Sequence, residues 1–198
     1  MNTEENKAAL QLLAKEAAGC VRCRLHEGRT NVVFGEGNPE ADLMFIGEGP
    51  GQHEDEQGLP FVGRSGELLS SLLEAVGLSR SQVYIANVVK CRPPGNRDPR
   101  QDEIDECKGY LAEQIRLVDP AVVITLGNFS TKLLLKTEVG ITRMRGQAYP
   151  WWGRHVVPTF HPAAALRGRS QVVEQMQADI ELALSVIANR QPEQAELF

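Results

Sequence analysis

Four cysteines are the residues of this chain whose spacing most directly indicates chemistry. They form two pairs, Cys20-x2-Cys23 and Cys91-x15-Cys107, and no cysteine is left over. In a reducing compartment, cysteines are more often metal ligands or catalytic groups than disulfides. A zinc ion accepts four thiolates, but zinc ribbons usually build both halves from tight turns, and a proline-rich loop lies within the second pair. A [4Fe–4S] cluster accepts irregular spacing, so the spacing favours a cluster and leaves zinc as the alternative.

Three other segments offer side chains that bind or activate a small ligand. GEGPG at 47–51 carries Glu48, the apolar segment 83–89 carries Asn87 near its end, and HPAA begins at His161. The glycine-rich segment has no Lys-Ser/Thr after it and no G-x-G-x-x-G frame, which argues against phosphate or dinucleotide binding. Its glycines instead permit a flat ligand to approach the backbone closely.

One aromatic residue lies close to these segments in the sequence. Phe61 stands in a loop between glycines, shortly after Glu54. An aromatic side chain in such a loop either packs against the core or offers a platform on which a planar ring stacks. The residues alone leave both roles open.

The elements that position these residues follow from the alternation of apolar and amphipathic segments. This alternation predicts an α/β domain with a parallel sheet whose strands are buried on both faces. In such sheets ligands bind beyond the carboxyl ends of the strands, where the loops with Glu48, Asn87 and His161 begin. The predicted strands span residues 42–47, 83–89, 121–127 and 156–160, and the predicted helices span 4–19, 64–77, 101–118 and 171–189.

The composition is that of one ordinary soluble domain, with 42% hydrophobic and 24% charged residues among 198. A chain of this length buries about 70% of its unfolded surface and needs no disulfides to fold. No apolar run approaches the ~20 residues of a membrane span, and the acidic start is unlike a signal peptide. We therefore expect a cytoplasmic protein. The net charge of −5 argues weakly against a nucleic-acid partner.

Five motifs occur together, in order, between about Cys20 and about Arg169. They are the cysteine quartet, GEGPG at 47–51, PFVGRSG at 60–66, NVVKCRPPGNR at 87–97 and FHPAA at 160–164. Together they resemble the family 4 uracil-DNA glycosylases, the iron–sulfur uracil-excision enzymes of bacteria and archaea. The resemblance covers about three quarters of the chain.

The resemblance implies a fold, a cofactor and an activity. The fold is a single three-layer α/β/α domain with a central four-stranded parallel sheet. The cofactor is a [4Fe–4S] cluster held by Cys20, Cys23, Cys91 and Cys107. The activity is that of a hydrolase that flips uracil out of DNA and cleaves its N-glycosidic bond, leaving an abasic site from which base excision repair begins.

The resemblance also assigns residues to base recognition. Phe61 would stack on uracil. The amide of Asn87 would pair with uracil O4 and N3–H, and cytosine presents the reversed pattern, which would leave mismatched buried groups at a cost of ~1–3 kcal/mol each. The backbone of Glu48 and Gly49 would line the same pocket.

Bond cleavage places negative charge on uracil O2 and positive charge on the sugar. By the same resemblance, His161 would donate a hydrogen bond to the developing oxyanion. A carboxylate from Glu48 or Glu54 would orient the attacking water, and the sequence does not choose between them. A related iron–sulfur branch traps its product through a histidine in an inserted basic loop, but no histidine lies between Cys91 and Cys107. We therefore expect turnover without covalent capture.

Basic residues gather in two segments in spite of the acidic total. Residues 90–100 and 139–170 together carry a charge of +8, and phosphate contacts dominate affinity for DNA. The stretch 163–170 resembles the intercalation loop of the family, in which Leu166 would wedge into the space left by the flipped base. The alternative is that Leu166 is a packing residue. The predicted DNA-contacting arginines are Arg145, Arg167 and Arg169.

The end of the chain forms a separate segment. Because Pro192 breaks the last predicted helix, we expect a glycosylase domain over 1–190 and a flexible tail over 191–198. Gln194, Leu197 and Phe198 resemble the Q-x-x-L-F pentapeptide with which bacterial replication proteins bind the sliding clamp. So short a motif also occurs by chance, and the alternative is a polar tail that ends in Leu-Phe and binds no sliding clamp.

Two hypotheses of different class follow. The first is a monomeric uracil-excision enzyme whose partner is single- or double-stranded DNA containing uracil. The second is a non-catalytic iron–sulfur protein that binds DNA or senses redox state on the same scaffold. The joint presence of Phe61, Asn87 and His161 favours the enzyme, because a binding protein would not need all three.

Overall fold

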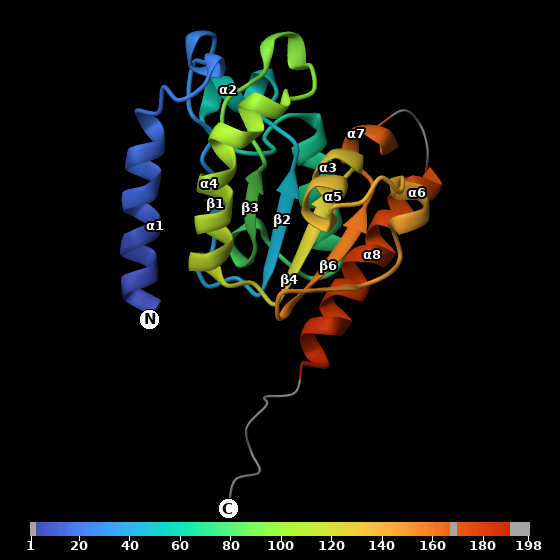
Figure 1. The fold of residues 1–198 in the computed structure, drawn as a ribbon. Coiled ribbons are helices and arrows are strands. Elements are labelled where there is room, and N and C mark those ends of the chain that lie inside the picture. Colours follow the sequence, from blue (N-terminus) through green and yellow to red (C-terminus); the bar gives the residue numbers. More distant parts are fainter. Residues whose placement is uncertain (1–2, 167–169, 191–198) are drawn as a thin grey trace, which may run out of the picture.

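The computed structural model describes residues 3–166 and 170–190. Its strands are β1 (Glu36–Gly37), β2 (Leu43–Gly47), β3 (Tyr84–Asn87), β4 (Val122–Leu126), β5 (Tyr149–Trp151) and β6 (Arg154–Thr159). Within the described residues they form one sheet in the order β1-β3-β2-β4-β6-β5 (Figure 1). The four central strands run parallel to one another, and each edge strand is antiparallel to its neighbour.

The predicted parallel sheet of four strands is confirmed as the centre of the structure, but the described sheet has six strands. The edge strands were missed because β1 has two residues and β5 has three, too few to show a recognisable alternation. β5 pairs with β6 only as far as Val156. Pro158 lies beyond this pairing, so β5 has no residue opposite it that would need a hydrogen bond from the missing N–H of the proline.

The four predicted helices are confirmed within two residues at each end, as α1 (Thr3–Ala18), α3 (Arg64–Ala75), α4 (Gln101–Val118) and α8 (Ser170–Ala188). Short helices also occur in the connections. The sequence analysis did not predict them, because segments of four to eight residues show little periodicity. No helix among the described residues is long and apolar enough to cross a membrane. The helices are α1 (Thr3–Ala18), α2 (Gln52–Gln57), α3 (Arg64–Ala75), α4 (Gln101–Val118), α5 (Asn128–Leu135), α6 (Ile141–Met144), α7 (Pro162–Ala165) and α8 (Ser170–Ala188), with 3-10 turns η1 (Arg24–Glu27), η2 (Arg80–Gln82) and η3 (Pro94–Asn96).

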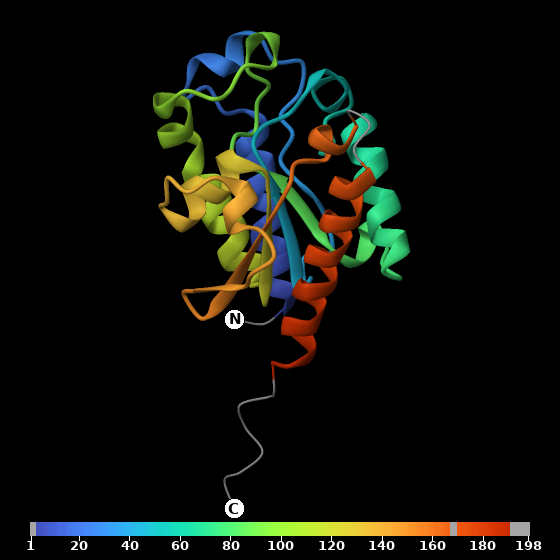
Figure 2. The ribbon, with the colours of Figure 1, turned by 90° about the vertical axis from the view of Figure 1, so that its right-hand side faces the viewer.

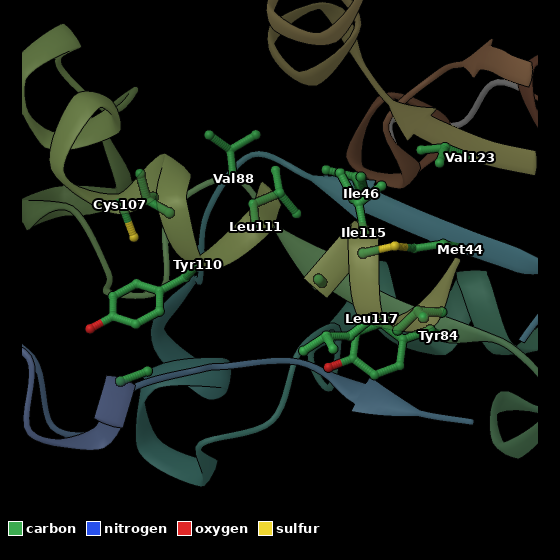
Figure 3. Close-up of a cluster of buried hydrophobic side chains, with 14 of the residues drawn as sticks. Met44, Ile46, Tyr84, Val88, Cys107, Tyr110, Leu111, Ile115, Leu117 and Val123 are labelled. Carbon is green, nitrogen blue, oxygen red and sulfur yellow. The ribbon is translucent and has the colours of Figure 1, made fainter. Parts of the chain in front are cut away.

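Helices cover both faces of the sheet and produce the three expected layers (Figures 1 and 2). Successive strand residues point to opposite faces, so Met44 and Ile46 of β2 pack under α1, α4 and α5. Figure 3 shows the first of these cores, with side chains of β2 and β3 packed against α4. Leu43 and Phe45 pack under α3 and α8 on the other face. Burial on both faces explains why these strands read as continuous apolar runs.

Candidate active site and cysteine cluster

A cavity of about 520 Å³ opens at the carboxyl ends of β2 and β3, where ligands bind in parallel sheets. Four loops supply its walls: the GEGPG segment, the Phe61 loop, residues 93–99 and the segment that starts at His161. The carboxylate, the amide and the imidazole that the sequence analysis placed on one rim therefore line one cavity.

Asn87 presents an unpaired acceptor at the base of this cavity. The residue is 2% exposed, and its Oδ1 has no hydrogen-bond partner. A buried oxygen in this state costs free energy unless a ligand supplies a donor. The absence of a side chain at Gly47 makes space for both groups, because a Cβ built there would lie 2.4 Å from Asn87 Oδ1 and 2.6 Å from the ring of Phe61. The site is thus shaped around one amide and one aromatic ring.

Phe61 packs in the core and also lines the cavity. The packing role is therefore confirmed, and stacking on a planar ring stays a prediction. Its backbone lies in the left-handed region, with φ of 51°, which is uncommon for a residue with a side chain. Arg80 Nη1 donates to the Phe61 carbonyl over 3.0 Å. Gly66 permits the close approach of the chain, because a Cβ there would lie 1.7 Å from the same carbonyl oxygen.

Glu54 fixes the loop that carries Phe61. Its carboxylate accepts the backbone N–H groups of Gly51, Val62 and Gly63 over 3.1, 2.9 and 2.9 Å. These three donors occupy most of the lone pairs of the carboxylate. Glu54 therefore lines the cavity with a carboxylate that is already bound to the loop of Phe61.

Glu48 is in a different environment. Its carboxyl is half-buried, and burial, followed by the neighbouring carboxylate of Asp98, raises the pKa of Glu48 to about 7. Asp98 reaches the cavity from the loop between Cys91 and Cys107. A carboxyl group with a pKa near neutrality is suited to taking up a proton at that pH.

His161 presents a neutral imidazole. The backbone N–H of Ala163 donates to Nδ1 over 3.2 Å, so the proton of the neutral ring is on Nε2. Burial lowers the pKa of His161, against the opposing effect of the Glu54 charge. The ring lies with its centroid 5.9 Å from that of Phe61. The remaining donor of the histidine, Nε2–H, therefore belongs to a ring that lines the cavity beside Phe61.

The four cysteines gather in a second, smaller cavity beside the first, and all four are free thiols. Burial raises the pKa of Cys107 to about 11, and the charges of Cys91 and Cys23 act in the same direction. Sulfur atoms from three separate segments therefore lie within electrostatic reach of one another.

The surroundings of the sulfurs fit a thiolate-bound cluster. Arg29 Nη1 donates to Cys91 Sγ over 3.4 Å, and the Lys90 backbone N–H donates to Cys107 Sγ over 3.3 Å. Such donors compensate negative sulfur. Across the described ranges, no three His, Cys, Asp or Glu residues converge as ligands of a single ion do. Four thiols with these donors fit a [4Fe–4S] cluster, and four thiolates are also a ligand set that zinc accepts.

The loop between Cys91 and Cys107 connects the two cavities. Arg97 Nη1 and Nη2 donate to the two carboxylate oxygens of Glu103 over 2.9 and 2.5 Å, and the Arg100 N–H donates to the same carboxylate over 2.8 Å. Glu103 is fully buried on the first turn of α4. This clamp holds the loop against the wall of the larger cavity.

The predicted DNA-contacting residues are in different situations. Leu166 follows α7 and is partly exposed. Arg145 donates from Nε and Nη2 to Asp179 over 3.0 and 2.7 Å, and its guanidinium lies 5.7 Å from the centroid of the Phe160 ring. The guanidinium of Arg145 is thus committed within the protein, which indicates a structural role for it. Arg167, Arg169 and the tail residues Gln194, Leu197 and Phe198 lie outside the described residues.

Sequence reasoning missed several residues of the larger cavity. Ser65, Asn96 and Asp98 line it, although their motifs, PFVGRSG and NVVKCRPPGNR, contributed to the resemblance. Asn96 has a φ of 54°, and its Oδ1 accepts a hydrogen bond from Arg92 Nε over 2.7 Å. The Gly-Asn pair after two prolines was a turn signal that would have indicated a tight loop returning to the pocket.

Comparisons with known proteins agree with this architecture. The profile of the Uracil DNA glycosylase superfamily matches residues 34–185. The type-4 uracil-DNA glycosylase of Sulfurisphaera tokodaii is 48% identical over 80% of this chain and 76% of its own length. That of Thermotoga maritima is 44% identical over 90% and 94%, and that of Saccharolobus solfataricus is 49% identical over 79% and 77%. Because the family model matches more than half of the chain and these relatives are similar over most of it, the chain belongs to the Uracil DNA glycosylase superfamily, among its type-4 members.

Proposed function

We propose that this protein is a monofunctional uracil-DNA glycosylase that hydrolyses the N-glycosidic bond of uracil in DNA and leaves an abasic site. The observation that carries the proposal is the unpaired, buried Oδ1 of Asn87 beside the rings of Phe61 and His161 in one cavity. Uracil supplies what this cavity lacks, namely an N3–H donor on a flat ring. The type-4 names of the relatives supply the substrate class.

Base selection would follow from the fixed amide of Asn87. Its Oδ1 accepts uracil N3–H and its Nδ2 donates to uracil O4, while the ring of Phe61 stacks against the base. Cytosine offers an acceptor at N3 and a donor at the C4 amino group, so both bonds would be mismatched. Each buried mismatch costs about 1–3 kcal/mol, which accounts for discrimination by the pocket.

Bond cleavage would use His161 and Glu48. As the base departs, negative charge develops on uracil O2, and the Nε2–H of neutral His161 stabilises it as an oxyanion donor. Glu48, whose pKa is about 7, accepts a proton from the attacking water and favours the positive sugar. Glu54 is committed to three backbone donors, so we assign it to positioning Phe61.

Cys20, Cys23, Cys91 and Cys107 would hold a [4Fe–4S] cluster. When bound, the cluster supplies a cross-link between the segment after α1, the segment after β3, and α4. This cross-link fixes both ends of the loop that carries Asn96 and Asp98 to the larger cavity. Analysis of iron and acid-labile sulfide in the purified protein tests the assignment: we expect four of each per chain, and one zinc without sulfide would refute it.

DNA contact would come from the surface around the cavity mouth. Leu166 would be the wedge that occupies the space of the flipped base, and Arg167 and Arg169 would contact phosphates. Arg145 is left out of this set because its guanidinium binds Asp179. The tail residues Gln194, Leu197 and Phe198 would bind a sliding clamp, and deletion of 194–198 should abolish capture by the clamp in a pull-down.

A single assay tests the proposed activity. The protein is incubated with a uracil-containing oligonucleotide, and alkali then cleaves the strand at abasic sites. His161→Ala should lose most strand cleavage, since one oxyanion donor is worth about 10²–10³ in kcat. His155→Ala, at the opposite end of β6, is the matched control and should remain active. Absence of cleavage by the unaltered protein, or undiminished cleavage by His161→Ala, would contradict the proposal, and a stable adduct on a denaturing gel would contradict turnover.

A further inference from the structure

Lys90 is an unusual residue to find at the centre of the molecule. It is 1% exposed and follows β3, between Asn87 and Cys91 in the sequence. Burial of a long cationic side chain is costly unless its donors are matched. An apolar residue of similar length would fill the same space at lower cost, so the reason for a lysine lies in the atoms to which its amine donates.

The partners of Lys90 are specific. Its Nζ donates to the backbone carbonyl of Asn87 over 2.8 Å and to Oε1 of Gln114. The same amine lies 5.8 Å from the centroid of the Phe34 ring. One buried amine therefore connects Asn87, which lines the larger cavity, with a side chain of α4.

Gln114 extends this connection to the other end of β3. It is fully buried, and its Nε2 donates to the Phe34 carbonyl over 2.8 Å and to the hydroxyl of Tyr84 over 3.1 Å. Tyr84 begins β3 and Asn87 ends it; Figure 3 shows Tyr84 packed beneath α4. The amide and the amine together hold both ends of one strand to α4.

The register of β3 decides where the amide of Asn87 points. The Cα–Cβ direction of a strand residue is fixed by the two peptide planes beside it, and Lys90 binds the carbonyl of one of these planes. A reactive geometry tolerates little error, because a displacement of about 1 Å can lower a rate about 10²-fold. A hydrogen bond to the Asn87 carbonyl therefore helps to fix the orientation of the Asn87 side chain.

We propose that Lys90 and Gln114 are positioning residues that orient Asn87 for base reading, by tying the end of β3 to α4. The inference rests on the proposed function, because it takes Asn87 as the residue that pairs with the base. It assigns to these two buried side chains an effect on uracil excision that passes through Asn87 alone.

A double-mutant cycle tests this coupling. Lys90→Met retains length and apolar volume but removes both hydrogen bonds, and we expect the single-turnover rate on uracil DNA to fall about 10²-fold. In an Asn87→Ala background the same change should alter the rate by no more than about twofold, since the residue to be oriented is gone. Full additivity of the two losses would overturn the proposal.

Two further variants separate positioning from stability. Gln114→Met leaves the lysine in place and removes its acceptor, so it should reproduce the non-additivity with Asn87→Ala even if Lys90→Met does not fold. Leu111→Ala, on the same helix and 5% exposed, is the matched control: it lowers stability, but its effect on the rate should be the same in both backgrounds. Equal coupling of Leu111→Ala to Asn87 would overturn the proposal.

The iron content gives an independent readout. The contact of residue 90 to Cys107 Sγ is made by its backbone N–H, so Lys90→Met should retain the metal content of the unaltered protein. Loss of iron in this variant would show that the side chain serves the cysteines, and would refute the assignment to Asn87. Failure of the proposed function itself is distinct, since the unaltered protein would then excise no uracil.

Discussion

Two glutamates six residues apart are in different surroundings. Glu54 accepts three backbone N–H groups and holds the Phe61 loop. Glu48 is half-buried beside Asp98 and has a pKa of about 7. Environments that separate the behaviour of neighbouring carboxyl groups are typical of acid–base sites. The sequence offered both residues as candidates for orienting the attacking water, and we propose Glu48 because the carboxylate of Glu54 already accepts three backbone donors.

The raised pKa of Glu48 predicts the pH dependence of excision. Glu48 is protonated below a pH of about 7 and can accept a proton only above it, so kcat/KM should rise as the pH increases through about 7. His161 does not produce this limb, because burial lowers its pKa and keeps the ring neutral there. Asp98→Asn removes the second cause of the raised pKa and should move the limb to lower pH. A pH–rate profile in which the limb stays in place in Asp98→Asn would contradict this prediction.

Gly47 predicts a steric effect on base binding. A methyl group at this position would overlap Asn87 Oδ1 and the Phe61 ring, so Gly47→Ala should lower kcat/KM on uracil DNA by about 10². The matched control is Gly109→Ala on α4, where a Cβ meets nothing within 4 Å. That change should leave excision intact and raise stability by up to about 1 kcal/mol. Single-turnover excision and thermal unfolding measure the two effects, and equal activity of both variants would refute the steric argument.

At the scale of elements, α4 organises both cavities. Glu103 clamps the loop with Asp98, Cys107 faces the other cysteines, and Gln114 holds β3. Intervals of four and seven residues place all three on one side of the helix. A single helix thus sets the relative position of the cysteine site and the larger cavity.

On the opposite face, α8 secures the approach to His161. Asp179 is fully buried and accepts from Thr159 Oγ1 over 2.6 Å as well as from Arg145. Thr159 ends β6, two residues before His161. The buried ion pair between α8 and the loop that contains Arg145 therefore fixes the strand from which the histidine emerges.

This ion pair predicts a stability effect. Asp179→Ala leaves the Arg145 guanidinium without its partner, and removal of one member of a buried pair typically costs about 3–5 kcal/mol. The free energy of unfolding, measured in urea, should fall by that amount, and kcat should fall with it because the end of β6 loosens. Asp105→Ala, which breaks an exposed pair with Lys108, should not lower stability measurably. Comparable losses in both variants would contradict the role given to burial.

At the scale of the whole molecule, the charge counted along the sequence is not the charge presented to DNA. Several basic residues of the two segments with a combined charge of +8 are buried or paired. Lys90 is enclosed in the core, Arg97 binds Glu103, Arg145 binds Asp179 and Arg154 binds Asp119. Fewer cations therefore remain for phosphate contacts than the sequence count implies.

The salt dependence of DNA binding tests this distinction. Arg100 is exposed and stands in the loop that borders the cavity, so Arg100→Gln should reduce the slope of log K against log[salt] by about 1. Arg154, at the start of β6 and the opposite end of the sheet, is paired with Asp119. Arg154→Gln should leave the slope unchanged. A similar decrease of the slope in both variants would contradict this distinction, because it would mean that Arg154 contacts DNA in spite of its ion pair with Asp119.

The sequence by itself determined the helices α1, α3, α4 and α8 and the central parallel strands, because long apolar periodicities leave little choice of element. It also brought Glu48, Asn87 and His161 to one rim, since the carboxyl ends of parallel strands share an edge. Only the tertiary structure decided the different surroundings of Glu48 and Glu54, which arginines are paired and which atoms Lys90 binds. These properties depend on hydrogen bonds between residues far apart in the chain, such as Arg145 with Asp179, and no local pattern encodes such a partner.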